Sequence, residues 1–252
     1  MWSLAMYPAL RRLPQGSQHI KFENGVSFST PKDEPLLHLL TEVWEEQRYI
    51  SPGWPQTLPP GDIVDIGAHM GIFTLWAATR WPGRKVVAIE PNPLSFEYLI
   101  RNITESRVEK VVPVNSACGE YHSKAILYQR GYHAMNTLFE KDNYGSEFSG
   151  NKNVYVVTLD DLFSQHQISQ CALMKIDCEG AEYGIIRAAD DATLKKCLRI
   201  AMEYHLGMND GTPERIAARL EPLGFRVDIH PPIDEEGGYL YAININAEGT
   251  SP

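Results

Sequence analysis

Hydrophobic positions in this chain follow two alternating periods, one typical of buried strands and one typical of helices. Segments with helical periodicity, such as residues 72–80, 93–102 and 181–189, alternate with short apolar runs. The runs that predict buried strands are residues 63–66, 86–89, 111–114, 172–177 and 198–204. Alternation of this kind predicts parallel strands joined by helical crossovers. The pattern therefore indicates an α/β protein with a doubly wound sheet.

The two ends of the chain extend this pattern. Residues 225–229 and 239–245 flank a loop rich in proline, glycine and acids, which predicts an antiparallel pair that completes the sheet. Near the start, short alternating pieces around Asn24-Gly25 predict a hairpin, and residues 35–49 predict an amphipathic helix with Trp44 on its apolar face.

The connector at residues 51–61 contains four prolines and two glycines. We therefore expect an N-terminal extension over 1–60 and a main domain over 61–252. Residues 128–153 interrupt the strand–helix rhythm with glycines, asparagines and aromatics, which is typical of a functional loop. Tyr132, His133 and Tyr144 in this insert either shape an acceptor pocket or lie exposed in solvent.

Composition narrows the class of protein. The net charge of −9 argues against a dedicated nucleic-acid binder, and no apolar run reaches the roughly 20 residues of a membrane-spanning helix. The cysteines Cys118, Cys171, Cys178 and Cys197 form no CxxC pair, so we expect reduced, mostly buried thiols and a cytoplasmic setting.

The stretch Asp62–Arg80 reads as a strand, a glycine turn and a helix, which is the nucleotide-binding corner of many α/β sheets. Its turn has the spacing Asp65-x-Gly67-x-His69-x-Gly71 and lacks the G-x-G-x-x-G pattern of a dinucleotide site. Asp65 would repel a phosphate but suits the cationic groups of S-adenosylmethionine. Glu90 ends the next strand, where a carboxylate can accept both ribose hydroxyls. Together these acids favour S-adenosylmethionine over NAD.

Four motifs in order resemble those of the FkbM-type methyltransferases, a family of the class I S-adenosylmethionine-dependent fold. They are Asp65-Ile66-Gly67-Ala68-His69-Met70-Gly71, Glu90-Pro91-Asn92-Pro93, Thr158-Leu159-Asp160-Asp161 and Lys175-Ile176-Asp177-Cys178-Glu179-Gly180-Ala181-Glu182. The resemblance implies a seven-stranded Rossmann-like sheet with helices on both faces. It also implies methyl transfer to a hydroxyl of a sugar or of a polyketide or peptide natural product. His69 replaces an expected asparagine, and Cys178 replaces a more usual valine.

The resemblance also suggests roles for single residues at the cofactor. Asp65, Gly67 and Gly71 are expected at its methionine end, Glu90 at the ribose, and Ser116 or Ala117 at the adenine edge. The complete predicted cofactor site is Asp65, Gly67, Ala68, His69, Gly71, Glu90, Pro91, Asn92, Ser116, Ala117 and Asp177.

Three residues are candidates for chemistry on the acceptor hydroxyl. Asp177 ends the central strand at 172–177, where doubly wound sheets bind ligands, and Glu179 lies on the turn after it. His205 follows the strand at 198–204 and is the best candidate for a general base, since an unperturbed imidazole titrates near neutrality. Glu179 could instead cap the next helix, and Asp177, Glu203 and His205 could hold a divalent cation.

The sequence therefore predicts an S-adenosylmethionine-dependent O-methyltransferase of small or carrier-attached hydroxylated substrates. Two rival functions remain open. A nicotinamide-dependent oxidoreductase could use the same sheet, although the glycine spacing argues against it. A binding module that kept the fold but lost catalysis is the other, although Asp65, Glu90 and Asp177 are intact. Neither the acceptor nor the oligomeric state can be inferred from the residues.

Overall fold

The computed structural model describes residues 19–32, 34–55, 57–129, 136–140, 148–207, 211–232 and 237–248. The predictions for Tyr132, His133 and Tyr144 concern residues outside these ranges. None of the helices in the described part combines the length and the apolar character that crossing a bilayer requires.

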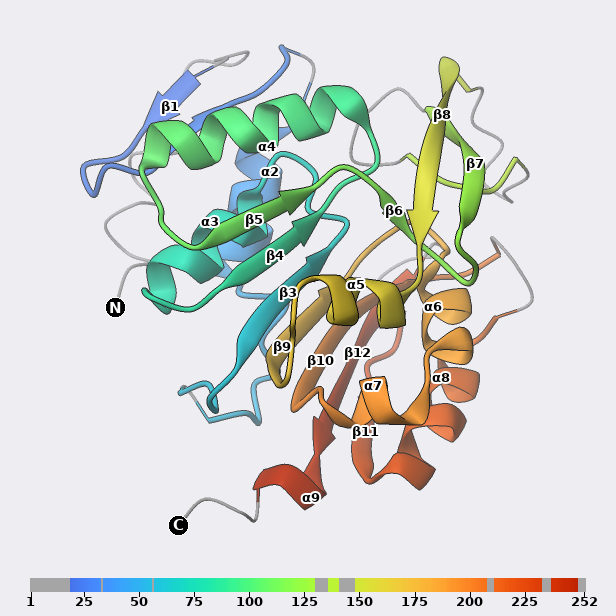
Figure 1. Ribbon diagram of the computed structural model, residues 1–252. Coiled ribbons are helices and arrows are strands. Elements are labelled where there is room, and N and C mark those ends of the chain that lie inside the picture. The colour runs from blue at the N-terminus through green and yellow to red at the C-terminus, as the bar shows by residue number, and fades with distance from the viewer. Residues whose placement is uncertain are drawn as a thin grey trace.

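A seven-stranded sheet forms the centre of the molecule (Figure 1). Its strands are β3 (Asp62–Ile66), β4 (Val86–Ile89), β5 (Val111–Val114), β9 (Cys171–Ile176), β10 (Arg199–His205), β11 (Phe225–Ile229) and β12 (Gly237–Asn244). They lie in the order β11-β12-β10-β9-β3-β4-β5. The first five in sequence pair in parallel, whereas β12 pairs antiparallel with both β10 and β11. The predicted sheet, including its terminal antiparallel pair, is confirmed.

Helices cover both faces of this sheet. One face packs against α5 (Leu159–Gln165), α6 (Glu182–Ala188), α7 (Asp191–Lys195) and α8 (Pro213–Leu220) in a single apolar cluster. The other face packs against α3 (Ile72–Arg80) and the N-terminal segments. Strand order reverses between β3 and β9, so the chain continues from these two strands toward opposite sides of the sheet, and ligands of doubly wound sheets bind at the carboxyl ends of such a pair.

The N-terminal extension packs against the main domain. The predicted hairpin is present as β1 (His19–Lys21) and β2 (Ser27–Ser29). The buried Asn102 side chain accepts the Ser29 N–H at 2.6 Å and donates to the carbonyls of Ser29 and Met70. It therefore ties the hairpin to the glycine turn after β3.

The predicted helix over 35–49 is shorter than expected. It consists of α2 (Leu36–Leu40) and a wide π-helical turn, η1 (Thr41–Glu45). Gln47 then adopts a left-handed backbone with φ of 52°, which a continuing helix does not allow. The chain turns there and brings Tyr49 toward the carboxyl ends of the central strands, where it contacts Asp177 and Glu203.

The insert at 128–153 is bounded by strands and is not a loop throughout. Long strands β7 (Ser123–Gln129) and β8 (Gly150–Val157) pair antiparallel, and β8 also pairs with the short β6 (Ala117–Cys118). The sequence predicts a strand or edge piece only over 154–159, because the burial pattern of β8 alternates only over its last residues and its first half is polar and exposed. The three strands form a separate small sheet beside the main one (Figure 1).

The remaining elements follow the prediction with shifted ends. The helix predicted over 93–102 is α4 (Pro93–Ser106), and Asn92 caps it by accepting the Leu94 N–H. The helix that Thr212 and Pro213 begin comprises α8 and the 3-10 turn η3 (Glu221–Leu223), and Gly224 closes it with φ of 94°. Thr212 makes no side-chain capping bond. A short α9 (Ile245–Glu248) ends the described chain.

Gly67, the first residue after β3, makes the closest approach in this region. Its φ is 76°, and a Cβ placed there would lie 1.7 Å from the carbonyl oxygen of Asp177. No side chain fits, because that oxygen belongs to the backbone at the end of β9. Gly67 therefore allows the turns after β3 and β9 to touch.

We predict that Gly67→Ala lowers the free energy of unfolding by more than the roughly 1–2 kcal/mol that a left-handed alanine costs by itself. Gly83→Ala is the matched control, since Gly83 has φ of 86° but a Cβ there meets nothing within 4 Å. Urea denaturation of both variants measures the difference. Equal destabilisation would show that the contact with Asp177 carries no cost.

Candidate functional site

A cavity of about 600 Å³ lies at the carboxyl ends of β3, β4, β9 and β10. The predicted site residues that line it are Gly67, Ala68, His69, Glu90, Pro91, Ala117, Asp177, Glu179, Glu203 and His205. Residues of the N-terminal extension close one side, among them Glu42, Arg48 and Tyr49. The structure thus gathers most of the predicted cofactor and catalytic residues around one space.

Four predicted residues do not line this cavity: Asp65, Gly71, Asn92 and Ser116. Gly71 begins α3 with φ of 89°, where a Cβ would meet Leu99 at 2.7 Å. Asn92 caps α4, and its N–H donates to Glu90 at 2.8 Å. These two residues therefore shape the turns that carry Gly67 and Glu90.

Asp65 is fully buried beneath the cavity and is already paired. Its Oδ2 accepts the hydroxyl of Thr74 at 2.6 Å, and its Oδ1 lies 3.4 Å from Lys175 Nζ. Burial raises the pKa of Asp65, although Lys175 and Thr74 favour the ionised form. The charge expected to face a cationic ligand is thus compensated within the protein.

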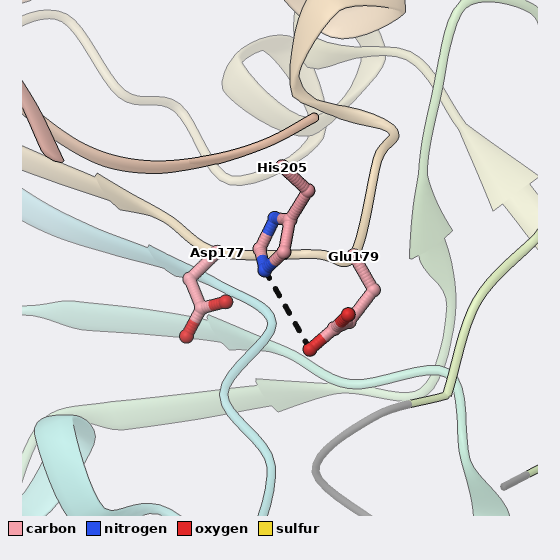
Figure 2. Close-up of side chains that lie close together, drawn as sticks. All are labelled: Asp177, Glu179 and His205. Atoms are coloured by element: carbon pink, nitrogen blue, oxygen red, sulfur yellow. Dashed lines mark ion pairs between the residues drawn. The ribbon is translucent and has the colours of Figure 1, made fainter. Parts of the chain in front are cut away.

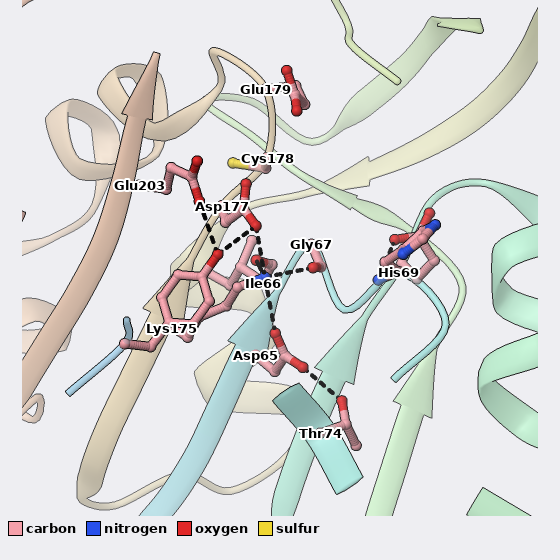
Figure 3. Close-up of polar contacts among 12 residues, drawn as sticks. Asp65, Ile66, Gly67, His69, Thr74, Lys175, Asp177, Cys178, Glu179 and Glu203 are labelled. Carbon is pink, nitrogen blue, oxygen red and sulfur yellow. Dashed lines mark hydrogen bonds and ion pairs between the residues drawn. The ribbon is translucent and has the colours of Figure 1, made fainter. Parts of the chain in front are cut away.

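Lys175 is the cation at the centre of the site (Figure 3). Its ammonium lies 3.3 Å from Asp177 Oδ2 and donates to the carbonyl oxygen of Gly67 at 2.6 Å, and the Tyr49 ring lies beside it. Burial favours the neutral amine, but Asp177 and Asp65 outweigh it and raise the pKa of Lys175 well above its usual value. Lys175 and His205 in turn favour the ionised form of Asp177, outweigh its burial and hold the pKa of this carboxyl below its usual value.

Glu90 presents an oriented carboxylate to the cavity. Its Oε2 accepts the His69 N–H and its Oε1 accepts the Asn92 N–H, both at 2.8 Å. Burial raises the pKa of Glu90 to about 7, although the two backbone N–H groups favour the ionised form. Each carboxylate oxygen retains a lone pair for a further donor, such as a ribose hydroxyl.

His69 connects the glycine turn with the N-terminal extension. Its backbone is left-handed with φ of 51°, a conformation that histidine, like asparagine, adopts more readily than most residues. Its imidazole Nε2 lies 3.8 Å from Glu34 Oε2, and the Glu34 side chain is almost completely buried. The side chain of His69 thus faces the extension, while its backbone N–H holds Glu90.

Asp177 and Glu203 share a tyrosine hydroxyl. The Tyr49 hydroxyl lies 2.8 Å from Asp177 Oδ2 and 3.0 Å from Glu203 Oε2, and Tyr239 donates to the same Glu203 oxygen at 3.0 Å. Burial and the nearby Asp177 raise the pKa of Glu203 to about 7. These contacts direct the bonded oxygen of Glu203 toward the tyrosines.

His205 lies between two acids of the segment that follows β9. Its Nδ1 is 2.9 Å from Glu182 Oε1, and its Nε2 is 3.7 Å from Glu179 Oε1 (Figure 2). Burial lowers the pKa of His205, but Glu179 and Glu182 outweigh it and raise this pKa well above its usual value. The near-neutral titration expected of His205 as a base is thus not what its surroundings favour.

Glu179 faces the cavity from a turn and does not cap α6. Its backbone is left-handed with φ of 54°, and burial raises the pKa of its carboxyl to about 8. The N–H groups of Cys178 and Gly180 donate to Glu182 instead. The fully buried Glu182 therefore holds the turn before α6, whereas the N-cap residue Ala181 makes no side-chain capping bond.

Sequence reasoning assigned no role to Lys175, Glu182 or Tyr49, although all three bind predicted site residues. A lysine inside an otherwise apolar strand is a signal that could have identified Lys175, because a buried cation requires partners. Glu182 and Tyr49 give no comparable signal, since acids at helix starts and aromatics near helix ends are common.

Curated relatives resemble the chain over most of its length. It is 26% identical over 234 residues to the 31-O-demethyl-FK506 methyltransferase FkbM of Streptomyces tacrolimicus, covering 82% of this chain and 88% of that protein. It is 27% identical over 216 residues to methyltransferase 1 of Beauveria bassiana, covering 79% and 86%.

A solved structure shares the fold. The crystal structure of methyltransferase FkbM from Methylobacillus flagellatus KT aligns with 94% of this chain and 59% of its own, with a TM-score of 0.51 and 16% identity. The model of the methyltransferase FkbM domain matches residues 65–227, which include the glycine turn, Glu90, Asp177 and His205. Since this match covers more than half of the 252 residues, the chain belongs to the FkbM methyltransferase family.

Proposed function

We propose that this methyltransferase uses S-adenosylmethionine to methylate a hydroxyl group of a sugar or of a polyketide or peptide natural product, free or attached to a carrier. The surplus of acids in the cavity carries this proposal. Five carboxylates line it, from Glu42, Glu90, Asp177, Glu179 and Glu203, against the permanent cations Arg48 and Lys175. Such a lining attracts a ligand with net positive charge and repels a pyrophosphate.

The residues present fit this cofactor. Glu90 offers acceptors for both ribose hydroxyls, and Gly67 lets the turns after β3 and β9, which line the cavity, lie in contact. Ala117 and Cys118 line the cavity where the adenine edge is expected. When bound, S-adenosylmethionine supplies a methyl group on a sulfonium, whose departure leaves a neutral thioether. The protein has to orient the acceptor, exclude water and remove the proton of the acceptor hydroxyl.

The proposed acceptor is supported by the position of the acids and by one relative. Asp177, Glu179 and His205 face the same space from the ends of two neighbouring strands, so they can orient a hydroxyl. The Streptomyces tacrolimicus relative is named for an O-demethylated substrate. The four cysteines, which are all free and of which three are buried, support a reducing, cytoplasmic setting.

Calorimetric titration with S-adenosylmethionine tests the cofactor, with NAD as the comparison. We expect heat of binding with S-adenosylmethionine alone. No heat at high micromolar ligand would remove the proposed function, and binding of NAD instead would favour the oxidoreductase. Transfer of a labelled methyl group into pools of glycans and natural-product intermediates then identifies the acceptor and excludes a catalytically silent binding module.

Removal of the Glu90 carboxylate should weaken cofactor binding. We expect Glu90→Ala to raise the dissociation constant by about 10- to 150-fold, because hydrogen bonds to a charged group contribute roughly 1.5–3 kcal/mol. Glu97→Ala, on the exposed side of α4, is the control and should bind normally. Calorimetry measures both, and unchanged affinity of Glu90→Ala would exclude the ribose role.

Cofactor affinity should also fall as pH decreases from 8 to 6. The pKa of Glu90 is raised to about 7, so its carboxylate is ionised above this value and becomes neutral below it. Only the ionised carboxylate accepts two hydroxyls in addition to its backbone hydrogen bonds. Below the pKa, the loss of cofactor affinity approaches about tenfold per pH unit. Glu90→Gln removes this component but not the titration of the cofactor's own amine. Identical pH profiles for both proteins would contradict the prediction.

Once an acceptor is known, His205→Ala should lower kcat by about 10²–10⁴-fold while cofactor binding is kept. Because Glu179 and Glu182 raise the pKa of His205, the rate of the unmodified protein should increase with pH as the imidazole becomes neutral and able to accept the proton. His205 faces Asp177 and Glu179 at the reacting end of the cavity, whereas Glu90 lies at the ribose end. His122→Ala is the control, because the His122 side chain is 69% exposed and pairs only with Asp161 among the contacts described. A variant with a normal rate would exclude His205 from the reaction.

A further inference from the structure

Asp177, Glu179 and His205 form a cluster with the composition of a metal site (Figure 2). One ligand atom from each residue lies within 4.8 Å of the other two. The carboxylates come from the turn after β9 and the imidazole from the end of β10, so two adjacent parallel strands bring them together. We call these three residues the acidic-histidine cluster.

The imidazole of this cluster is oriented as a metal ligand would be. Its Nδ1 bonds to Glu182 at 2.9 Å, and the same Glu182 oxygen accepts the N–H groups of Cys178 and Gly180 at 3.0 and 3.2 Å. Glu182 is therefore fixed, and it leaves Nε2 directed at the two carboxylates. Metal-bound histidines commonly donate their second N–H to a carboxylate in this manner.

The charge balance around the cluster also favours a cation. Glu179, Glu182 and Glu203 surround His205, and the nearest lysine, Lys175, is shared between Asp65 and Asp177. Among the described residues, no lysine or arginine lies within ion-pair distance of Glu179. Carboxylates buried in such excess require either protons or a cation.

We propose that the acidic-histidine cluster binds one divalent cation of the Mn²⁺ to Zn²⁺ class through one oxygen of Asp177, one oxygen of Glu179 and Nε2 of His205. Mixed oxygen and imidazole donors suit these ions. Ligands of one ion lie about 3 Å apart, since each is roughly 2.1 Å from the metal. The separation of 3.7 Å between Nε2 and Glu179 Oε1 approaches this value, and rotation of the carboxylate side chains supplies the rest.

Three protein ligands leave coordination positions open toward the cavity. A cation there would act as a Lewis acid on the acceptor hydroxyl and ease the loss of its proton. This catalytic role rests on the proposed function, whereas binding of the cation does not. The ligand set also differs from the one expected from sequence, because Glu179 takes the place of Glu203, whose Oε2 bonds to Tyr49 and Tyr239.

The test uses the full chain after treatment with a chelator. Mn²⁺ is titrated and its free fraction is measured by electron paramagnetic resonance, and Zn²⁺ is measured by competition with a coloured chelator. We expect one site per chain, with affinity at least tenfold weaker in Glu179→Gln and in His205→Ala. Glu203→Gln, on the same strand as His205, should weaken binding less than Glu179→Gln does, because Glu203 contributes charge but no ligand atom. Glu97→Gln, on the exposed side of α4, is the control and should bind normally. Circular dichroism verifies that each variant is folded.

Saturation by neither ion at millimolar concentration would overturn the inference, as would equal affinity in His205→Ala and the unmodified protein. Loss of binding in Glu203→Gln, with Glu179→Gln unaffected, would overturn the proposed ligand set. Calorimetry with S-adenosylmethionine on the same samples separates the two proposals. Cofactor binding without a cation site contradicts only this inference, and a cation site without cofactor binding contradicts only the proposed function.

Discussion

The buried ammonium of Lys175 is the interaction on which the site depends. It lies at the point where strand order reverses and binds Asp65, Asp177 and the carbonyl oxygens of Ile66 and Gly67. Removing one partner of a buried ion pair costs roughly 3–5 kcal/mol, because the remaining charge loses its compensation. Lys175 thereby holds the ends of β3 and β9 together at the bottom of the cavity.

This pairing divides the acids of the site into two groups. Asp65 and Asp177 share a lysine, so their charges are balanced within the fold. Burial raises the pKa values of Glu90 and Glu179 to about 7 and about 8, because the opposing effects of Lys175 on Glu90 and of His205 on Glu179 are smaller. The unbalanced acids line the cavity, Glu90 beside the glycine turn after β3 and Glu179 beside His205. A positively charged ligand in the cavity would therefore compensate carboxylate charges that the protein itself does not balance.

Sequence periodicity predicted the sheet well, because buried parallel strands appear as continuous apolar runs with polar residues where they end. It located Glu90, Asp177 and His205 at one edge for the same reason. It could not show that Asp65 points away from the cavity, since the direction of a side chain at a strand end depends on its partners. Lys175 is 110 residues from Asp65 in the chain. Contacts between residues so far apart in the sequence do not appear as hydrophobic periodicity.

The same limit applies to the N-terminal extension. Its pattern predicts a hairpin and an amphipathic helix, and nothing in it indicates that the chain turns at Gln47 to bring Tyr49 onto Asp177 and Glu203. Glu34 similarly reaches His69, whose backbone N–H holds Glu90. The extension thus reaches the cavity at two places, beside the turn that holds Glu90 and beside the acids at the ends of β9 and β10.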